Sequence, residues 1–205
     1  MIMQGIDISH HNYSLIRAKG ASYLYDKASL GFVIMKATEG VTFDDPRYNE
    51  YIRMIGESNI RYGFACAGAY HYARPENNTA LAEAKHFVDR IKPFAGSMLL
   101  ALDVEGRALQ YPNIDKWCYE WLKAVEDMTG GVKPLVYCQR SALNLFDLVP
   151  ANDYGLWLAA WQKAVPKNPE PWEFMAIWQN NGMNLDTDLF YGDPKQWAKY
   201  ASGGK

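Results

Sequence analysis

Short apolar segments recur along this chain, and amphipathic segments separate most of them. Eight apolar segments have the length and composition of buried strands: residues 3–8, 31–37, 62–72, 98–105, 134–138, 154–160, 174–179 and 185–190. Strands that alternate with helices are typical of parallel βα units. The pattern therefore predicts an α/β fold with a mostly parallel sheet.

The helices between the first strands are marked by their starts and by their apolar stripes. Asp45 followed by Pro46 predicts a helix that begins there and runs to about Ser58. Residues 79–91 are rich in Ala, Glu and Lys, and Pro93 ends that segment. A further helix is predicted by apolar residues on one helical stripe, namely Ile114, Trp117, Trp121, Val125 and Met128.

The last quarter of the chain lacks such helices. Pro166, Pro169 and Pro171 forbid a regular helix after the sixth strand, and residues 180–184 are too few for a parallel crossover. The chain thus predicts five βα units followed by three strands. Eight strands indicate a closed TIM-like barrel, and the missing helices explain a length below the usual ~250 residues. We assign residues 1–191 to the barrel and residues 192–205 to a tail that packs on it or trails from it.

Polar side chains gather where these strands end. Asp103 and Glu105 follow a buried strand and point to the same side, with Cα atoms about 6–7 Å apart. Two carboxyl groups that close push their pKa values apart, which suits general-acid chemistry on a glycosidic bond. The other strand ends carry further acidic, basic, aromatic and amide residues: Asp7, Lys36, Glu39, Tyr70, Tyr72, Tyr137, Trp161, Trp178, Gln179 and Asp186.

Composition and charge narrow the function. A net charge of −2 gives no electrostatic case for nucleic acid or for an anionic membrane, whereas 14% aromatic residues favour a sugar-binding protein. Three cysteines without a CxxC spacing predict neither a disulfide framework nor a zinc site. His10 and His11 lack a third ligand at suitable spacing, so we expect no metal and no cofactor. We expect a monomer.

The first residues do not have the pattern of a secretory signal, and no apolar run is long enough to cross a membrane. We therefore expect a protein that is made in the cytoplasm and reaches its substrate by another route.

Six short motifs occur in the order seen in glycoside hydrolase family 25, the lysozymes of phages, bacteria and some fungi. They are Asp7-Ile8-Ser9, Lys36-Ala37-Thr38-Glu39-Gly40, Gly68-Ala69-Tyr70-His71-Tyr72, Asp103-Val104-Glu105, Trp178-Gln179 and Asp186-x-Asp188-Leu-Phe190. The chain resembles this family over residues 3 to 191. The resemblance implies a flattened (β/α)5β3 barrel and cleavage of the β-1,4 bond between N-acetylmuramic acid and N-acetylglucosamine in peptidoglycan. It also implies action on the bacterial cell wall, with release like that of a phage endolysin or by another non-classical route.

By the same resemblance, Glu105 matches the general acid, Asp103 the second carboxylate of its pair, and Asp7 and Asp186 the other two acids. We expect the three Asp charges to raise the pKa of Glu105. Substrate-assisted attack by the acetamido group, direct attack by an Asp, and a water activated by Asp7 or Asp186 all remain open. Substrate contacts are expected from Lys36, Glu39, Tyr70, Tyr72, Tyr137, Trp161, Trp178 and Gln179. We expect His71 to be a hydrogen-bonded barrel residue instead of an acid catalyst.

Two rival functions remain. One is a chitinase-like glycosidase acting on other N-acetylated sugars, because Asp-x-Glu strand ends recur in such enzymes. The other is a non-catalytic cell-wall-binding barrel, which predicts the loss of an essential acid.

Overall fold

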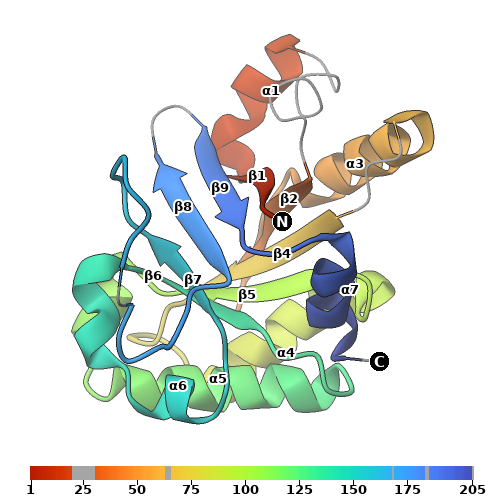
Figure 1. Ribbon diagram of the computed structural model, residues 1–205. Helices are drawn as coiled ribbons and strands as arrows, with labels where there is room; N and C mark the ends of the chain where they lie inside the picture. The colour runs from red at the N-terminus through yellow and green to blue at the C-terminus, as the bar shows by residue number, and fades with distance from the viewer. Residues whose placement is uncertain (20–30, 63–65, 168, 183–184, 205) are drawn as a thin grey trace.

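A closed barrel of eight strands forms the centre of the computed structural model (Figure 1). The structure describes residues 1–19, 31–62, 66–167, 169–182 and 185–204. The barrel strands are β1 (Met3–Ile8), β2 (Phe32–Glu39), β4 (Cys66–Tyr72), β5 (Leu99–Asp103), β6 (Leu135–Gln139), β7 (Leu156–Ala159), β8 (Ile177–Asn181) and β9 (Asp186–Phe190). Pairing of β1 with β2 closes the ring, and the short strand β3 (Phe43–Asp44) pairs antiparallel with the end of β2. The predicted barrel is confirmed.

The last barrel strand runs against the other seven. Those seven strands, β1, β2 and β4 to β8, pair in parallel with their neighbours, whereas β9 is antiparallel to both β8 and β1. The start of β9 therefore lies at the same rim as the ends of the parallel strands. This reversal brings Asp186 directly opposite Asp7.

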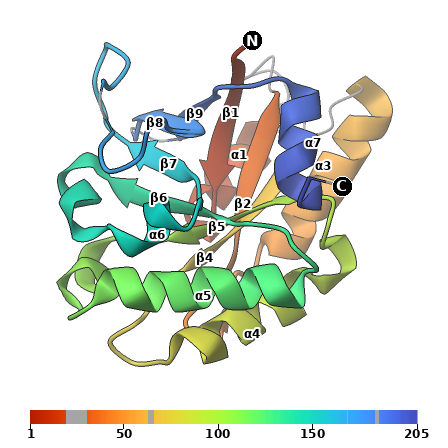
Figure 2. The ribbon, with the colours of Figure 1, turned by 60° about the horizontal axis from the view of Figure 1, so that its bottom comes forward.

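The described helices are α1 (Tyr13–Lys19), α3 (Tyr48–Tyr62), α4 (Ala80–Ile91), α5 (Ile114–Met128), α6 (Leu148–Ala151) and α7 (Pro194–Ser202). Short 3-10 turns lie at His10–Asn12, Lys92–Phe94, Gly106–Gln110 and Arg140–Leu145. Figure 2 shows α4 and α5 side by side along one side of the barrel. The predicted helices at 79–91 and 114–128 are confirmed, and Thr79 caps the first of them by accepting from the Ala82 N–H.

Two predicted boundaries are shifted. Helix α3 begins at Tyr48, three residues after Asp45. Asp45 still marks this start, because its Oδ1 accepts from the Arg47 backbone N–H at 2.8 Å. Its Oδ2 accepts from the backbone and the ring of His10, at 3.0 and 2.8 Å. At its other end α3 runs to Tyr62, so Tyr62 does not open a strand and β4 begins only at Cys66.

Alternation along each strand divides the core into two parts. In β2, Phe32 and Ile34 point into the barrel, whereas Val33 and Met35 pack outside it against the helices. The inner core fills the lower barrel with residues such as Leu135 and Ile177. A packed lower barrel leaves room for a polar cavity only near the carboxyl ends of the strands.

Helix α7 closes the opposite end of the barrel. Trp197 is 2% exposed, and its ring lies 4.7 Å from the Phe32 ring and 5.1 Å from the Phe190 ring, measured between centroids. Its indole N–H donates to the Ala67 carbonyl at 3.3 Å. Residues 194–202 are therefore an integral part of the barrel core.

Replacing Trp197 with Ala should lower the free energy of unfolding by about 3–5 kcal/mol, because the change leaves a large cavity at the barrel floor. Urea unfolding at pH 7 measures this loss. Phe174→Ala, at a side chain that is 63% exposed, serves as the control and should have little effect. Equal stability of the two variants would contradict the role of α7.

Candidate active site

A cavity of about 260 Å³ opens at the carboxyl ends of the barrel strands. It is lined by Asp7, Tyr70, Asp103, Glu105, Tyr137, Trp157, Trp161, Gln179, Gly182 and Asp186. All four acids predicted from the sequence line this one cavity, although they come from three strands and the turn after β5. Asp7 and Asp103 are each 7% exposed, and Glu105 and Asp186 are half-buried. Four carboxylates in so small a space would destabilise the folded protein if all were ionised, unless bound protons or a substrate reduce the repulsion and the desolvation cost.

Gln179 organises one wall of the cavity. Its Oε1 accepts hydrogen bonds from the Tyr137 hydroxyl at 3.0 Å and from the Trp161 indole N–H at 3.1 Å. Because two donors meet at Oε1, the Nε2 group faces the other way and donates to Asp7 Oδ2 at 2.8 Å. The amide thus links an aromatic wall to an acid.

The Asp103 and Glu105 pair departs in one respect from its prediction. Burial, and next the charge of Glu105, raise the pKa of Asp103 well above its usual range. Burial also raises the pKa of Glu105, with a contribution from Asp186, but Lys36 and Arg74 oppose this rise. Asp103 therefore holds its proton tightly. The acid whose charge raises the pKa of Glu105 is Asp186, on β9, and not its neighbour Asp103.

The pKa of Asp7 is raised as well, and it lies near neutral pH. Burial, and then the charge of Asp186 on the paired strand, raise the pKa of Asp7 to about 7. The bond from Gln179 acts in the opposite direction, because it stabilises the anion. Asp7 can therefore change its protonation state near neutral pH.

Lys36 and Glu39 lie at the rim as an ion pair. Lys36 Nζ is 2.6 Å from Glu39 Oε2, and Arg74 binds the other oxygen of the same carboxylate. The Lys36 ammonium also lies 4.6 Å from the centre of the Tyr72 ring. Glu39 is therefore shared between Lys36 and Arg74, whereas Arg47 binds Glu50.

Three of the expected aromatic residues, Tyr70, Tyr137 and Trp161, line the cavity. Tyr72 stands next to them, with its hydroxyl against Gly106 in the turn after Glu105. The Trp161 ring is 68% exposed and rests on Gly182, where a Cβ would meet the ring at 2.3 Å. An exposed ring with a fixed indole N–H is well suited to stacking on a sugar.

Trp178 does not lie in the cavity, contrary to expectation. It is 3% exposed, packs in the outer core, and donates its indole N–H to the Ala160 carbonyl at 2.8 Å. The reason is strand alternation: Gln179 faces inward, so its neighbour Trp178 must face the helices.

Replacing Trp161 with Ala should raise KM for cell-wall substrate by about tenfold, because one stacking surface is lost. The melting temperature should stay nearly unchanged, because the ring is largely exposed. Trp178→Ala is the matched comparison: it should lower the melting temperature by several degrees. Initial rates over a range of wall concentrations, together with thermal melts, measure both effects. An unchanged KM for Trp161→Ala would contradict the binding role.

The histidines serve the fold. His71 is fully buried on the outside of the barrel, where Thr38 Oγ1 lies 2.7 Å from Nδ1 and Glu83 Oε2 lies 2.8 Å from Nε2. Its interpretation as a hydrogen-bonded barrel residue is confirmed. His10 is held by Asp45 and lies beside His11, with ring centroids 3.9 Å apart and ring planes tilted by 39°. Across the described ranges, no three His, Cys, Asp or Glu side chains are grouped as a metal site, and no helix is long and apolar enough to span a membrane.

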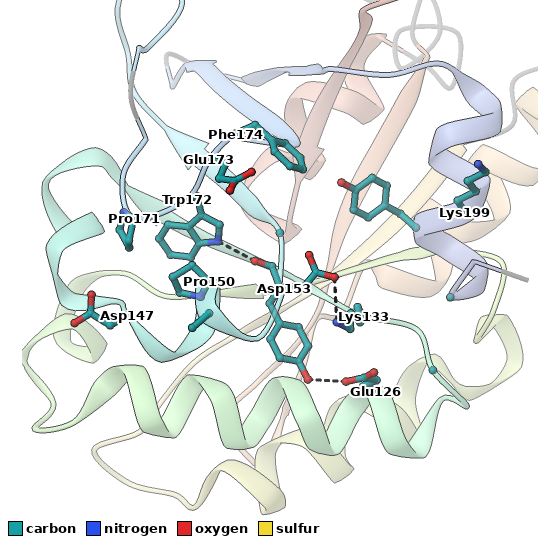
Figure 3. Close-up of a pocket in the computed structure, with 16 residues that line it drawn as sticks. Glu126, Lys133, Asp147, Pro150, Asp153, Pro171, Trp172, Glu173, Phe174 and Lys199 are labelled. Carbon is teal, nitrogen blue, oxygen red and sulfur yellow. Dashed lines mark hydrogen bonds and ion pairs between the residues drawn. The ribbon is translucent and has the colours of Figure 1, made fainter.

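A larger cavity of about 860 Å³ lies at the opposite end of the barrel (Figure 3). Among its lining residues, Asp153 pairs with Lys133 at 3.3 Å and Glu126 accepts from the Tyr154 hydroxyl at 2.6 Å. Its four carboxylate side chains, on Glu126, Asp147, Asp153 and Glu173, are exposed or half-buried. This cavity lacks the desolvated carboxyl pair that distinguishes the smaller one.

Asp188 is a fifth acid that the sequence analysis did not place in the site. It is 1% exposed and lies beneath the cavity, where Oδ1 accepts from the Trp157 indole N–H at 2.8 Å. The sequence could have indicated this position, because Asp188 follows Asp186 by two residues and residues i and i+2 of a strand face the same side.

Comparisons with known proteins agree with this geometry. The model of the glycosyl hydrolases family 25 matches residues 6–185. The chain is 27% identical over 202 residues to the N,O-diacetylmuramidase of Chalaropsis sp, covering 87% of this chain and 88% of that protein. It is 28% identical over 213 residues to the Uncharacterized protein YegX of Escherichia coli strain K12, covering 99% and 75% respectively.

Among solved structures, the family GH25 lysozyme from Aspergillus fumigatus superposes with a TM-score of 0.80 at 26% identity. That match covers 99% of this chain and 100% of the lysozyme. The chain belongs to glycosyl hydrolase family 25 and is a glycoside hydrolase.

Proposed function

We propose that this protein is a muramidase that hydrolyses the β-1,4 bond between N-acetylmuramic acid and N-acetylglucosamine in peptidoglycan. Relatives named N,O-diacetylmuramidase and lysozyme support peptidoglycan as the substrate. The observation that carries the proposal is the position of Glu105. Its half-buried carboxyl group lines the cavity together with Asp7, Asp103 and Asp186, and burial raises its pKa.

Glu105 acts as the general acid in this proposal. A carboxyl group with a raised pKa keeps its proton until the substrate arrives and then donates it to the leaving glycosidic oxygen. As that bond breaks, positive charge develops on the sugar ring. The negative charge that Asp7 and Asp186 carry when ionised stabilises this oxocarbenium-like state.

We favour participation by the substrate's own acetamido group. Its oxygen forms a bond to the anomeric carbon while the glycosidic bond breaks, and Asp103 orients and polarises the amide. Water then opens the cyclic intermediate and gives up a proton to Glu105, so the product retains its configuration. Direct attack by an Asp would also retain the configuration, whereas a water activated by Asp7 or Asp186 would invert it.

Proton NMR of the first product formed from a soluble muropeptide oligomer separates these routes. A β-anomer as the first product supports a retaining route, and an α-anomer requires the activated water. A thiazoline analogue of the cyclic intermediate should inhibit only an enzyme that uses the acetamido group.

The remaining cavity residues are assigned to binding. We propose that Trp161, Tyr70 and Tyr137 contact sugar faces, with Gln179 fixed between them. Lys36, Glu39 and Tyr72 would contact the glycan at the rim.

Analysis of the reducing ends produced from purified cell walls tests the function itself. Borohydride reduction followed by acid hydrolysis should yield reduced muramic acid. Reduced glucosamine would instead indicate a glucosaminidase or chitinase-like specificity, and binding without any new ends would indicate a non-catalytic barrel.

A further inference from the structure

Asp188 occupies a distinctive place beneath the cavity. On the paired strands β1 and β9, Asp7 lies opposite Asp186, and Gly5 lies opposite Asp188. Asp7 and Asp188 are therefore diagonal neighbours on the inward face of these two strands. Besides burial, the charge of Asp7 and a hydrogen bond to it both raise the pKa of Asp188, as expected for two carboxyl groups that face each other across this diagonal.

One buried oxygen of these two carboxyl groups lacks a hydrogen-bond donor in the described part of the chain unless the pair carries a proton. Asp188 Oδ1 accepts from Trp157 at 2.8 Å, but Oδ2 is buried and receives no hydrogen bond from the described residues. Asp7 Oδ2 accepts from Gln179. Two ionised carboxylates in contact would repel each other and leave Oδ2 unsatisfied, whereas one proton between them serves both groups.

The surroundings decide which group holds that proton. Asp188 is 1% exposed and lies below the cavity, whereas Asp7 is 7% exposed and lines it. The deeper group loses more solvation when it ionises, so the proton resides on Asp188. Burial, followed by the charge of Asp7, raises the pKa of Asp188 well above its usual range, in agreement with this assignment.

We propose that Asp188 is a positioning residue whose protonated carboxyl group donates a hydrogen bond to Asp7 and holds Asp7 as an anion facing the substrate. This inference rests on the proposed function only in the role of the Asp7 anion, which is to stabilise the positive charge on the sugar. Asp188 itself touches no substrate. Its hydrogen bond adds to the one that Gln179 donates, and together they stabilise the Asp7 carboxylate at a position that is only 7% exposed.

Infrared difference spectroscopy tests the protonation state without any activity. At pH 8, the wild-type spectrum should contain a C=O band of a protonated carboxyl group that the Asp188→Asn spectrum lacks. Asp89→Asn, on the exposed side of α4, is the control and should remove no such band. Loss of an ionised-carboxylate band for Asp188→Asn would overturn the proposal.

Kinetics provide the second arm. The side-chain amide introduced by the conservative variant Asp188→Asn still donates to Asp7 and accepts from Trp157, so kcat should stay within about threefold of the wild type. Asp188→Leu has a similar shape but no donor. Its kcat should fall more than about tenfold, and the acid limb of its pH profile should move up by about one unit, because the Asp7 anion loses a hydrogen bond.

The outcomes separate the two proposals. If Asp188→Asn is as inactive as Asp188→Leu, a negative charge at this position is required and the inference fails, even though the wild type clears cell walls. If the wild type clears no walls, the proposed function fails while the infrared result still decides the protonation of Asp188. If Asp188→Leu does not fold, Asp188→Asn and the infrared spectra remain decisive.

Discussion

Replacing Glu105 with Gln should reduce the clearing of purified bacterial cell walls by about 10³-fold or more. The amide keeps the size of the side chain but has no acidic proton for the glycosidic oxygen, and general-acid catalysis contributes about 10²–10⁴-fold. Turbidity loss of a wall suspension at 25 °C measures the effect. Binding of the variant to walls in a pelleting assay should remain, because the contacts of Trp161 and Gln179 are untouched.

Glu120→Gln is the matched control for this experiment. Glu120 lies on α5 with 53% of its side chain exposed, and it pairs with Lys116 at 3.8 Å. The change is chemically identical but lies outside the cavity, so activity should equal that of the wild type. Equal clearing by Glu105→Gln would remove Glu105 from the acid role and leave Asp103 as the next acid to test.

Replacing Asp7 with Asn should lower kcat by about 10²–10³-fold, because the cavity loses a negative charge that faces the developing cation. The amide oxygen of the substituted side chain can still accept from Gln179, so the wall formed by Gln179, Tyr137 and Trp161 should persist. Rates on soluble muropeptide oligomers measure the loss. A variant with wild-type kcat would contradict a role for the Asp7 charge.

The same variant should be more stable than the wild type, and more so at high pH. The pKa of Asp7 in the folded protein is about 7, above its ordinary value of 3.8. The folded state therefore binds more protons than the unfolded state between these values, and the free energy of unfolding falls as pH rises through them. Asp7→Asn removes this penalty, which we expect to be roughly 2–4 kcal/mol at pH 8 and smaller at pH 5. Urea unfolding at both pH values measures the difference.

Opposite changes in activity and stability would show that the acid cluster is kept for catalysis. A loss of stability for Asp7→Asn at pH 8 would show instead that the Asp7 anion is well solvated by Gln179 and its neighbours.

The fold could be predicted from the sequence because its signals are local. Apolar segments at strand spacing, the helical stripe at 114–128 and the prolines after residue 165 were sufficient for a barrel of five βα units and three strands. Boundaries were less accurate, because α3 extends to Tyr62 where the sequence predicted the start of a strand. Asp45 binds the Arg47 N–H as a helix-start residue does, but its second oxygen binds His10 from a distant part of the chain, which no local signal indicates.

The acids of the site could be predicted from the sequence, whereas the aromatic and amide residues that line the cavity were predicted less accurately. Strand ends of a parallel barrel meet at one rim, so acids at those ends must converge, and Asp7, Asp103, Glu105 and Asp186 do. Which neighbour faces inward depends on the register of each strand. A shift of one residue exchanges the two faces, which is why Trp178 was placed in the cavity when only Gln179 belongs there.

Periodicity and strand ends depend on near neighbours along the chain, so the barrel and the acids of its rim follow from the amino-acid sequence alone. The sharing of protons among those acids follows only from the folded arrangement. It depends on the antiparallel pairing of β9 with β1, which places Asp186 opposite Asp7 and Asp188 beneath it. Desolvation and charge act through space, and the sequence does not contain those distances.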